Sequence, residues 1–141
     1  MGWRENIQLI MIRIIFSILT LLLFLRCNSG INSISNIEFE KLKGDHILID
    51  VRTIDEHLVG NIPGSINIDY NSKKFESEIF AFDKSQKIIL YCKTNNRSSK
   101  AASFLSQNGY SNIFVLEEGF KGWFLDQKIK KNKFKDLSIN P

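Results

Sequence analysis

The chain has 141 residues, of which 43% are hydrophobic and 24% are charged, so it can build one domain with a substantial core. Its formal net charge of +4 is unevenly distributed: residues 31–126 carry 11 basic and 13 acidic side chains, whereas residues 127–141 carry five lysines and one aspartate. The near balance of charges at residues 31–126 argues against nucleic-acid binding by this part of the chain. The distribution indicates instead a near-neutral domain followed by a solvated basic C-terminal tail, residues 127–141.

Residues 1–30 have the pattern of a targeting segment. Arg4 and Arg13 precede an apolar run at residues 14–25, which would be about 18 Å long as a helix, shorter than the roughly 30 Å hydrocarbon core of a bilayer. The run therefore fits a secretory signal peptide better than a membrane span. We expect residues 1–30 to be a signal peptide or an N-terminal membrane anchor, so that the protein is exported, periplasmic or membrane-anchored facing outside the cytoplasm. A buried core helix and lipid attachment at Cys27 are the alternatives.

The next part of the chain alternates short apolar runs with helix-start signals. A Ser or Thr followed three residues later by Glu, at residues 35–38 and 53–56, predicts two capped helices that end near Gly44 and Gly60. The apolar runs predict an edge strand at residues 32–35, a buried strand at residues 46–51, and a turn with a short strand at residues 62–68.

The second half continues the alternation. Residues 72–82 and 97–108 predict helices, the latter ended by Gly109, and a closing helix begins at residue 119. Residues 87–91 and 112–116 predict two further strands. Five strands interleaved with helices indicate an α/β domain at residues 31–126, with a parallel sheet covered on both faces, that is, three α/β/α layers. In such sheets ligands bind beyond the carboxyl ends of the strands.

Cys92 lies at such a strand end. If residues 1–30 are removed, it is the only cysteine left, so it is either a small buried hydrophobe or a reactive thiol. It directly follows the strand at residues 87–91 and precedes a polar loop, a position that favours reactivity. The start of a helix with cations nearby, here Lys93 and Arg97, favours the thiolate, and the backbone N–H groups of the loop form an anion site.

Several separated motifs resemble the rhodanese-like sulfurtransferases. They are "LIDVRTIDEHLVGNIPGSINI" at residues 48–68 and "YCKTNNRSSKAASFLSQNGYSNIFVLEEGFKGW" at residues 91–123. The resemblance implies a five-stranded parallel sheet and a persulfide that forms on Cys92 and passes to a nucleophilic acceptor. The expected partners are a small sulfur-donor anion and a thiol or other nucleophile, without nucleic acid, metal or other cofactor; the oligomeric state is left open. The expected substrate-binding residues are Lys93, Thr94, Asn95, Asn96 and Arg97.

Other residues have predicted supporting roles. We expect Asp50, Arg52 and Glu56 to form a structural network beside the loop, and His46 and His57 to have surface or structural roles. In the resemblance, Asn95 and Asn61 replace a common glycine and a common histidine, and Glu118 replaces the first of two glycines near the pocket. Asn95 is therefore expected in a left-handed conformation, and Glu118 is expected to repel an anionic donor.

Two other functions stay open at this point. A rhodanese-like fold can serve as a catalytically silent module that binds a partner protein. A phosphatase or arsenate reductase is a minor alternative, because related enzymes of those classes have a loop one residue longer than the six residues from Cys92 to Arg97.

Overall fold

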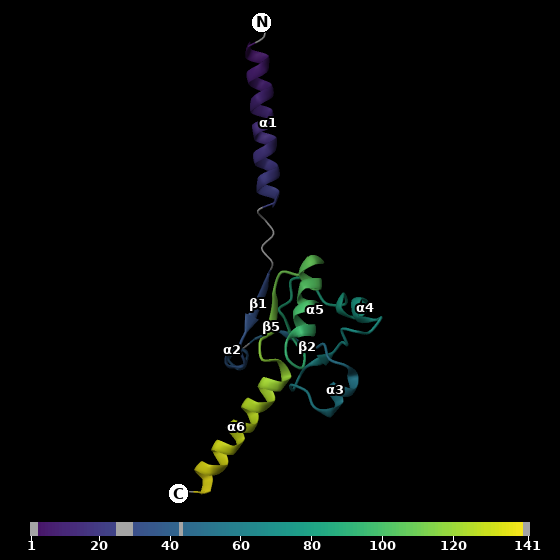
Figure 1. Ribbon diagram of the computed structural model, residues 1–141, viewed down its shortest axis with the longest axis vertical. Helices are drawn as coiled ribbons and strands as arrows, with labels where there is room; N and C mark the ends of the chain where they lie inside the picture. The colour runs from purple at the N-terminus through teal and green to yellow at the C-terminus, as the bar shows by residue number, and fades with distance from the viewer. Residues whose placement is uncertain (1–2, 25–29, 43, 140–141) are drawn as a thin grey trace.

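The computed structural model describes residues 3–24, 30–42 and 44–139, which form six helices and five strands in this part of the chain (Figure 1). In chain order these are α1 (Trp3–Phe24), β1 (Ile31–Ile34), α2 (Asn36–Lys41), β2 (Ile47–Asp50), α3 (Ile54–Val59), β3 (Ile66–Asn67), α4 (Phe75–Ile79), β4 (Ile88–Tyr91), α5 (Asn96–Gln107), β5 (Ile113–Leu116) and α6 (Gly119–Ile139).

The five strands form one parallel sheet in the order β1-β5-β4-β2-β3, which confirms the predicted fold class. β4 is the central strand, and all four of its residues are buried. A strand covered on both faces reads as a continuous apolar run, which explains the sequence "IILY". β1 lies at one edge of the sheet, as predicted.

Alternate residues of each strand enter two separate cores, one on each face of the sheet. Along β4, Ile88 and Leu90 pack on one side, where α4 and α5 contribute Phe75, Ala101, Ala102 and Leu105. Ile89 and Tyr91 pack on the other side, against Phe39 of α2, Leu42 directly after α2, and Phe120 and Trp123 of α6. The domain therefore has three layers, with α4 and α5 on one face and α2 and α6 on the other (Figure 1). α3 buries none of its residues.

Most predicted elements are present, because local signals define their ends. Both capping boxes form as predicted, at Ser35 with Glu38 and at Thr53 with Glu56. The helix predicted at residues 72–82 is shorter: α4 spans only Phe75–Ile79. Beyond it, hydrogen bonds between residues three apart, such as Phe82 N to Ile79 O at 3.4 Å, replace the α-helical pattern of bonds between residues four apart.

Two findings concern the terminal segments. None of the helices in the described part of the chain is long and apolar enough to span a membrane. At the other end, α6 crosses residue 127, where we expected the basic tail to begin, and continues to Ile139.

α6 begins in direct contact with the loop that follows β4. The N–H groups of Phe120 and Lys121 donate to the carbonyls of Cys92 (2.8 Å) and Lys93 (3.0 Å). Gly119 has φ +58°, and a Cβ placed there would lie 2.2 Å from Thr94 O. Only glycine permits both the left-handed backbone and this close approach.

We predict that Gly119→Ala destabilises the fold more than Gly64→Ala does. Gly64 also has a positive φ, +83°, but no heavy atom lies within 4 Å of the position that a Cβ would take there, so Gly64→Ala measures the backbone penalty alone, about 1–2 kcal/mol. Gly119→Ala adds the collision with the loop, a further 1–3 kcal/mol or so. Urea denaturation of both variants compares the two free energies of unfolding. Equal losses would show that the loop yields to the added methyl group.

Candidate active site

Cys92 lies at the carboxyl end of β4, as predicted. It continues the side-chain alternation of Ile88 and Leu90, so it faces the core shared with α5, and it is only 1% exposed. Its neighbour in the loop, Lys93, is exposed, as are Thr94, Asn95 and Asn96. The thiol is therefore at the base of the loop, beneath solvent-exposed residues.

Ser98 contacts the thiol, and we did not predict this from the sequence. Its hydroxyl, in a fully buried residue of the first turn of α5, lies 3.6 Å from Cys92 Sγ and 3.0 Å from Asn95 O, to which it donates. A hydroxyl that can turn to donate to sulfur stabilises a thiolate more than a thiol. The available signal was a serine six residues after the cysteine, inside the predicted helix.

The loop backbone presents N–H groups away from α6. A trans peptide directs its N–H opposite to its carbonyl, so the carbonyls of Cys92 and Lys93, which bond to α6, turn the amides of Lys93 and Thr94 to the other side. Asn95 O accepts from Ser99 N at 2.9 Å, which similarly directs the next amide out of the helix end. The first amides of a helix have no partner within it, so this loop can bind an anion.

The expected left-handed conformation of Asn95 is wrong. Asn95 has φ −163° and ψ −2°, an extended φ that any residue adopts, and all described positive φ angles belong to glycines. The glycine common at this position in the family is therefore not required here by φ. The exposed Asn95 side chain forms no cap hydrogen bond.

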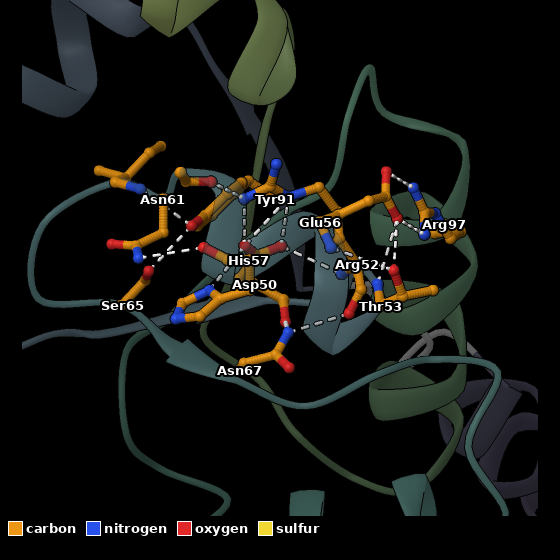
Figure 2. A network of polar contacts seen from close by, with 12 residues as sticks. Asp50, Arg52, Thr53, Glu56, His57, Asn61, Ser65, Asn67, Tyr91 and Arg97 are labelled. Atoms are coloured by element: carbon orange, nitrogen blue, oxygen red, sulfur yellow. Dashed lines mark hydrogen bonds and ion pairs between the residues drawn. The ribbon is translucent and has the colours of Figure 1, made fainter.

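Arg97 is paired with Glu56 across 41 residues of sequence. Its two terminal nitrogens, Nη1 and Nη2, donate to Glu56 Oε2 (2.6 Å) and Oε1 (2.9 Å), a bidentate pair between α5 and α3 (Figure 2). The Arg97 hydrogen bonds, opposed by partial burial, lower the pKa of Glu56 to about 2. Arg97 therefore fixes the end of the loop, and its charge is shared with a carboxylate rather than free for an anion.

Asp50 and Arg52 form a second, buried network, separate from the first (Figure 2). Asp50 accepts from Arg52 N (3.0 Å), Nε (2.9 Å) and Nη2 (2.6 Å), and His57 Nδ1 lies 2.9 Å from Asp50 Oδ2. Burial opposes the charge of Arg52, but hydrogen bonds to Asp50 raise its pKa. The guanidinium also donates to Gly60 O (2.7 Å) and lies 4.1 Å from the ring centre of Phe120. These contacts fit the structural role predicted for Asp50, Arg52 and His57, whereas Glu56, which we expected in the same network as Asp50 and Arg52, is bonded to Arg97 instead.

Tyr91 extends this network to the turn before β3. Its hydroxyl accepts from Ile62 N (3.1 Å) and lies 2.8 Å from Ser65 Oγ (Figure 2). Burial, partly offset by these hydrogen bonds, raises the pKa of Tyr91 to about 12. The hydroxyl is therefore neutral at physiological pH and serves as a fixed link between β4 and the turn.

The Glu118 side chain bonds to the start of α2, which differs from the role that we expected for it. Its Oε2 accepts the backbone N–H of Asn36 at 3.1 Å, at the start of α2. A carboxylate bound at a helix start is stabilised there, so it is not free to repel a donor at the loop. Asn61 Nδ2 donates to His57 O (3.3 Å), and His46 Nδ1 lies 3.0 Å from Gly44 O.

We predict that the ion pair between Glu56 and Arg97 makes the free energy of unfolding depend on pH in the acidic range. Because the pKa of Glu56 in the folded state (about 2) is below its ordinary value of 4.5, the pair stabilises the fold above pH 4.5 and loses this contribution as the pH falls toward 2. Glu56→Gln should lower the free energy of unfolding by about 1 kcal/mol at pH 7 and much less near pH 2. Urea denaturation across this pH range measures the difference.

Glu38→Gln is the matched control. Glu38 occupies the same capping-box position on α2, but its carboxylate bonds to Ser35 and not to an arginine. If both substitutions change the pH profile equally, the effect comes from the capping box and not from Arg97.

Comparisons with known proteins agree with this geometry. The family model of the rhodanese-like domain matches residues 35–126. A thiosulfate:glutathione sulfurtransferase of Saccharomyces cerevisiae is 30% identical over 110 residues, which cover 67% of this chain and 79% of that protein. A tRNA uridine(34) hydroxylase of Cytophaga hutchinsonii is 30% identical over 95 residues, but these cover only 30% of that longer protein and 64% of this chain.

Among solved structures, a rhodanese-related protein from Thermoplasma volcanium aligns with a TM-score of 0.61 and 29% identity, covering 67% of this chain and 92% of that one. The family match spans more than half of the chain and includes every strand except β1. The chain therefore belongs to the rhodanese-like domain family.

Proposed function

We propose that this protein is a sulfurtransferase that carries sulfur as a persulfide on Cys92. The observation that carries the proposal is the place of this thiol, at the carboxyl end of the central strand, 3.6 Å from the Ser98 hydroxyl and at the base of an amide-lined loop. A relative that covers most of the domain is named a thiosulfate:glutathione sulfurtransferase, which supports the same reaction class.

The reaction has two balanced steps. The Cys92 thiolate attacks the outer sulfur of thiosulfate, a sulfur–sulfur bond to Cys92 forms, and sulfite leaves with the electron pair of the broken bond. A thiolate acceptor then attacks the outer sulfur of the persulfide, and Cys92 leaves as the thiolate. No oxidant or reductant is consumed, because one sulfur atom is transferred without net electron transfer.

The loop is suited to the charges in both steps. The amides of Lys93 and Thr94 lie on the side away from α6, and the Lys93 ammonium is exposed and makes no ion pair among the described residues. Fixed N–H donors and one such cation stabilise an incoming anion and an anionic persulfide without reorganisation during the reaction. Ser98 supplies a hydroxyl next to sulfur.

A silent binding module is the second candidate, favoured by the burial of Cys92. A thiol that is 1% exposed and packed in the core can also be a small hydrophobe. The two candidates differ in one measurable property, which is whether sulfur from a donor reaches Cys92.

We also propose that residues 1–30 export the domain. The support is the apolar run at residues 14–25 behind two arginines. Expression of the full chain in a bacterial host, followed by fractionation and intact-mass analysis, should locate the protein outside the cytoplasm. Recovery of the full-length chain in the cytoplasm would contradict export.

We predict that Cys92 gains one sulfur atom on incubation with thiosulfate. The experiment uses the full chain carrying Cys27→Ser, so that Cys92 is its only thiol, and intact-mass spectrometry detects the added atom. The addition should disappear after treatment with a reducing thiol, and it should be absent when Cys92→Ser is added.

Ser98→Ala tests whether the hydroxyl serves the chemistry. A hydrogen bond to a charged group contributes about 1.5–3 kcal/mol, so we expect loading with sulfur to slow by about tenfold or more while the fold persists. Ser103→Ala, an exposed hydroxyl on the same helix, is the control.

If neither thiosulfate nor an organic persulfide transfers sulfur to Cys92, the proposal of a sulfurtransferase is wrong, and the silent binding module becomes the proposed function.

A further inference from the structure

Two open hollows lie along α6, and both include Phe124. The first, about 510 Å³, lies between α3, the loop and α6, and its lining includes Val59, Lys93, Lys121 and Leu125. The second, about 440 Å³, follows the next turns of α6 and includes Lys128 and Lys131. We call Lys121, Phe124, Leu125, Lys128 and Lys131 the α6 strip.

The α6 strip is the face of the helix that does not contact α2. On the other face, Asp126 accepts from Asn36 Nδ2 (2.8 Å), and Lys130 pairs with Glu40. Members of the strip follow one another at intervals of three, one, three and three residues, so they share one side of a helix. Contacts with α2 thus orient α6 so that the strip faces solvent. Phe124 is 53% exposed and Leu125 is 49% exposed.

The strip combines exposed apolar side chains with unpaired cations. In the part of the chain that the structure describes, Lys121, Lys128 and Lys131 form no ion pair, whereas Lys130 on the opposite face does. Exposed apolar patches beside uncompensated charge are typical of interaction surfaces, and they favour a partner of opposite charge. The complementary ligand is acidic and carries apolar side chains.

The position of the strip connects it to the candidate active site. Lys121 to Lys131 spans about 15 Å along the helix, the length of about five residues of extended chain. One end of the strip meets Lys93, the residue next to Cys92, in the lining of the first hollow. A chain bound along the strip therefore ends beside the loop.

We propose that the α6 strip docks a protein that accepts sulfur from Cys92, through an acidic segment with apolar anchors. This inference rests on the proposed sulfurtransferase function. The acceptor's cysteine thiolate attacks the outer sulfur of the Cys92 persulfide, forms a sulfur–sulfur bond, and displaces the Cys92 thiolate. The acceptor gains the persulfide, so atoms and electrons balance.

A polypeptide fits the strip better than nucleic acid or an anionic membrane does. Asp55, which forms no ion pair among the described residues, lines the α3 side of the first hollow, so a uniformly anionic surface meets repulsion there. A peptide can place an apolar side chain against α3 and Phe124 while its carboxylates meet the lysines of α6.

The binding test uses the full chain with Cys92→Ser, so that it does not depend on catalysis. The probe is a fluorescent peptide of about eight residues in which Glu alternates with Leu, compared with a peptide in which Lys replaces each Glu. Fluorescence anisotropy should show tighter binding of the acidic peptide. Combined Lys121→Glu and Lys128→Glu should weaken it by about tenfold or more, and Phe124→Ser should also weaken it.

Lys73→Glu combined with Lys74→Glu is the matched control, because it makes the same charge change at exposed positions before α4, on the other face of the sheet. The control should leave the affinity within about twofold, since distant exposed charges are screened. The inference is overturned if wild type binds both peptides equally, or if the control weakens binding as much as the strip variants do. It is also overturned if single-stranded RNA or phosphatidylglycerol vesicles displace the acidic peptide and lose affinity in the strip variants.

The transfer test uses the persulfide form of the chain with Cys27→Ser and the same two peptides, each extended by a terminal cysteine. The second-order rate constant for sulfur transfer should be about tenfold higher for the acidic peptide, and Lys121→Glu with Lys128→Glu should remove this preference. Equal rates for the two peptides would overturn the inference. Failure of Cys92 to load with sulfur would instead refute the proposed function, and the binding test would still decide whether the strip docks an acidic segment.

Discussion

Two backbone hydrogen bonds determine the arrangement of the candidate active site. The first amides of α6 hold the carbonyls of Cys92 and Lys93, and the peptide geometry then turns the loop amides away from α6. The close approach requires Gly119 at the start of the helix. Because these contacts join the C-terminal helix to the central strand, the loop conformation depends on how α6 packs on the sheet. The positions of the thiol and of the loop amides therefore both depend on the position of α6.

Of the cationic side chains around the loop, two arginines are held in ion pairs and one lysine is exposed to solvent. Arg52 is held by Asp50, and Arg97 is held by Glu56, so both guanidinium groups stabilise the framework. Lys93 keeps an exposed ammonium. A site with two neutralised arginines attracts an anion less strongly than a site with three free cations, because each carboxylate cancels much of the field of its partner. Binding of a small anion here thus relies mainly on the loop amides and on one lysine.

The sequence predicted the features that depend on near neighbours along the chain. The strands, both capping boxes and the position of Cys92 at the end of β4 follow from local patterns, since burial alternates every two residues and caps span three. Contacts between distant segments could not be predicted in this way. The Glu56 to Arg97 pair joins residues 41 apart, and Glu118 bonds to Asn36, 82 residues away. The conformation of Asn95 also differs from the expectation: its φ is extended, and its carbonyl accepts from Ser99 N in the first turn of α5.

One face of α6 contacts α2, and the α6 strip on the other face is exposed to solvent. Its contacts with α2, through Asp126 and Lys130, oppose rotation of the helix about its axis. A ligand bound to the opposite face therefore meets a helix of fixed orientation, in which the amides of Phe120 and Lys121 hold the loop. The loop at Cys92 is thus held by hydrogen bonds that are already formed in the free protein. In the docking that we propose, the acceptor meets a loop that is already in place, which reduces the entropy cost of aligning the two sulfur atoms.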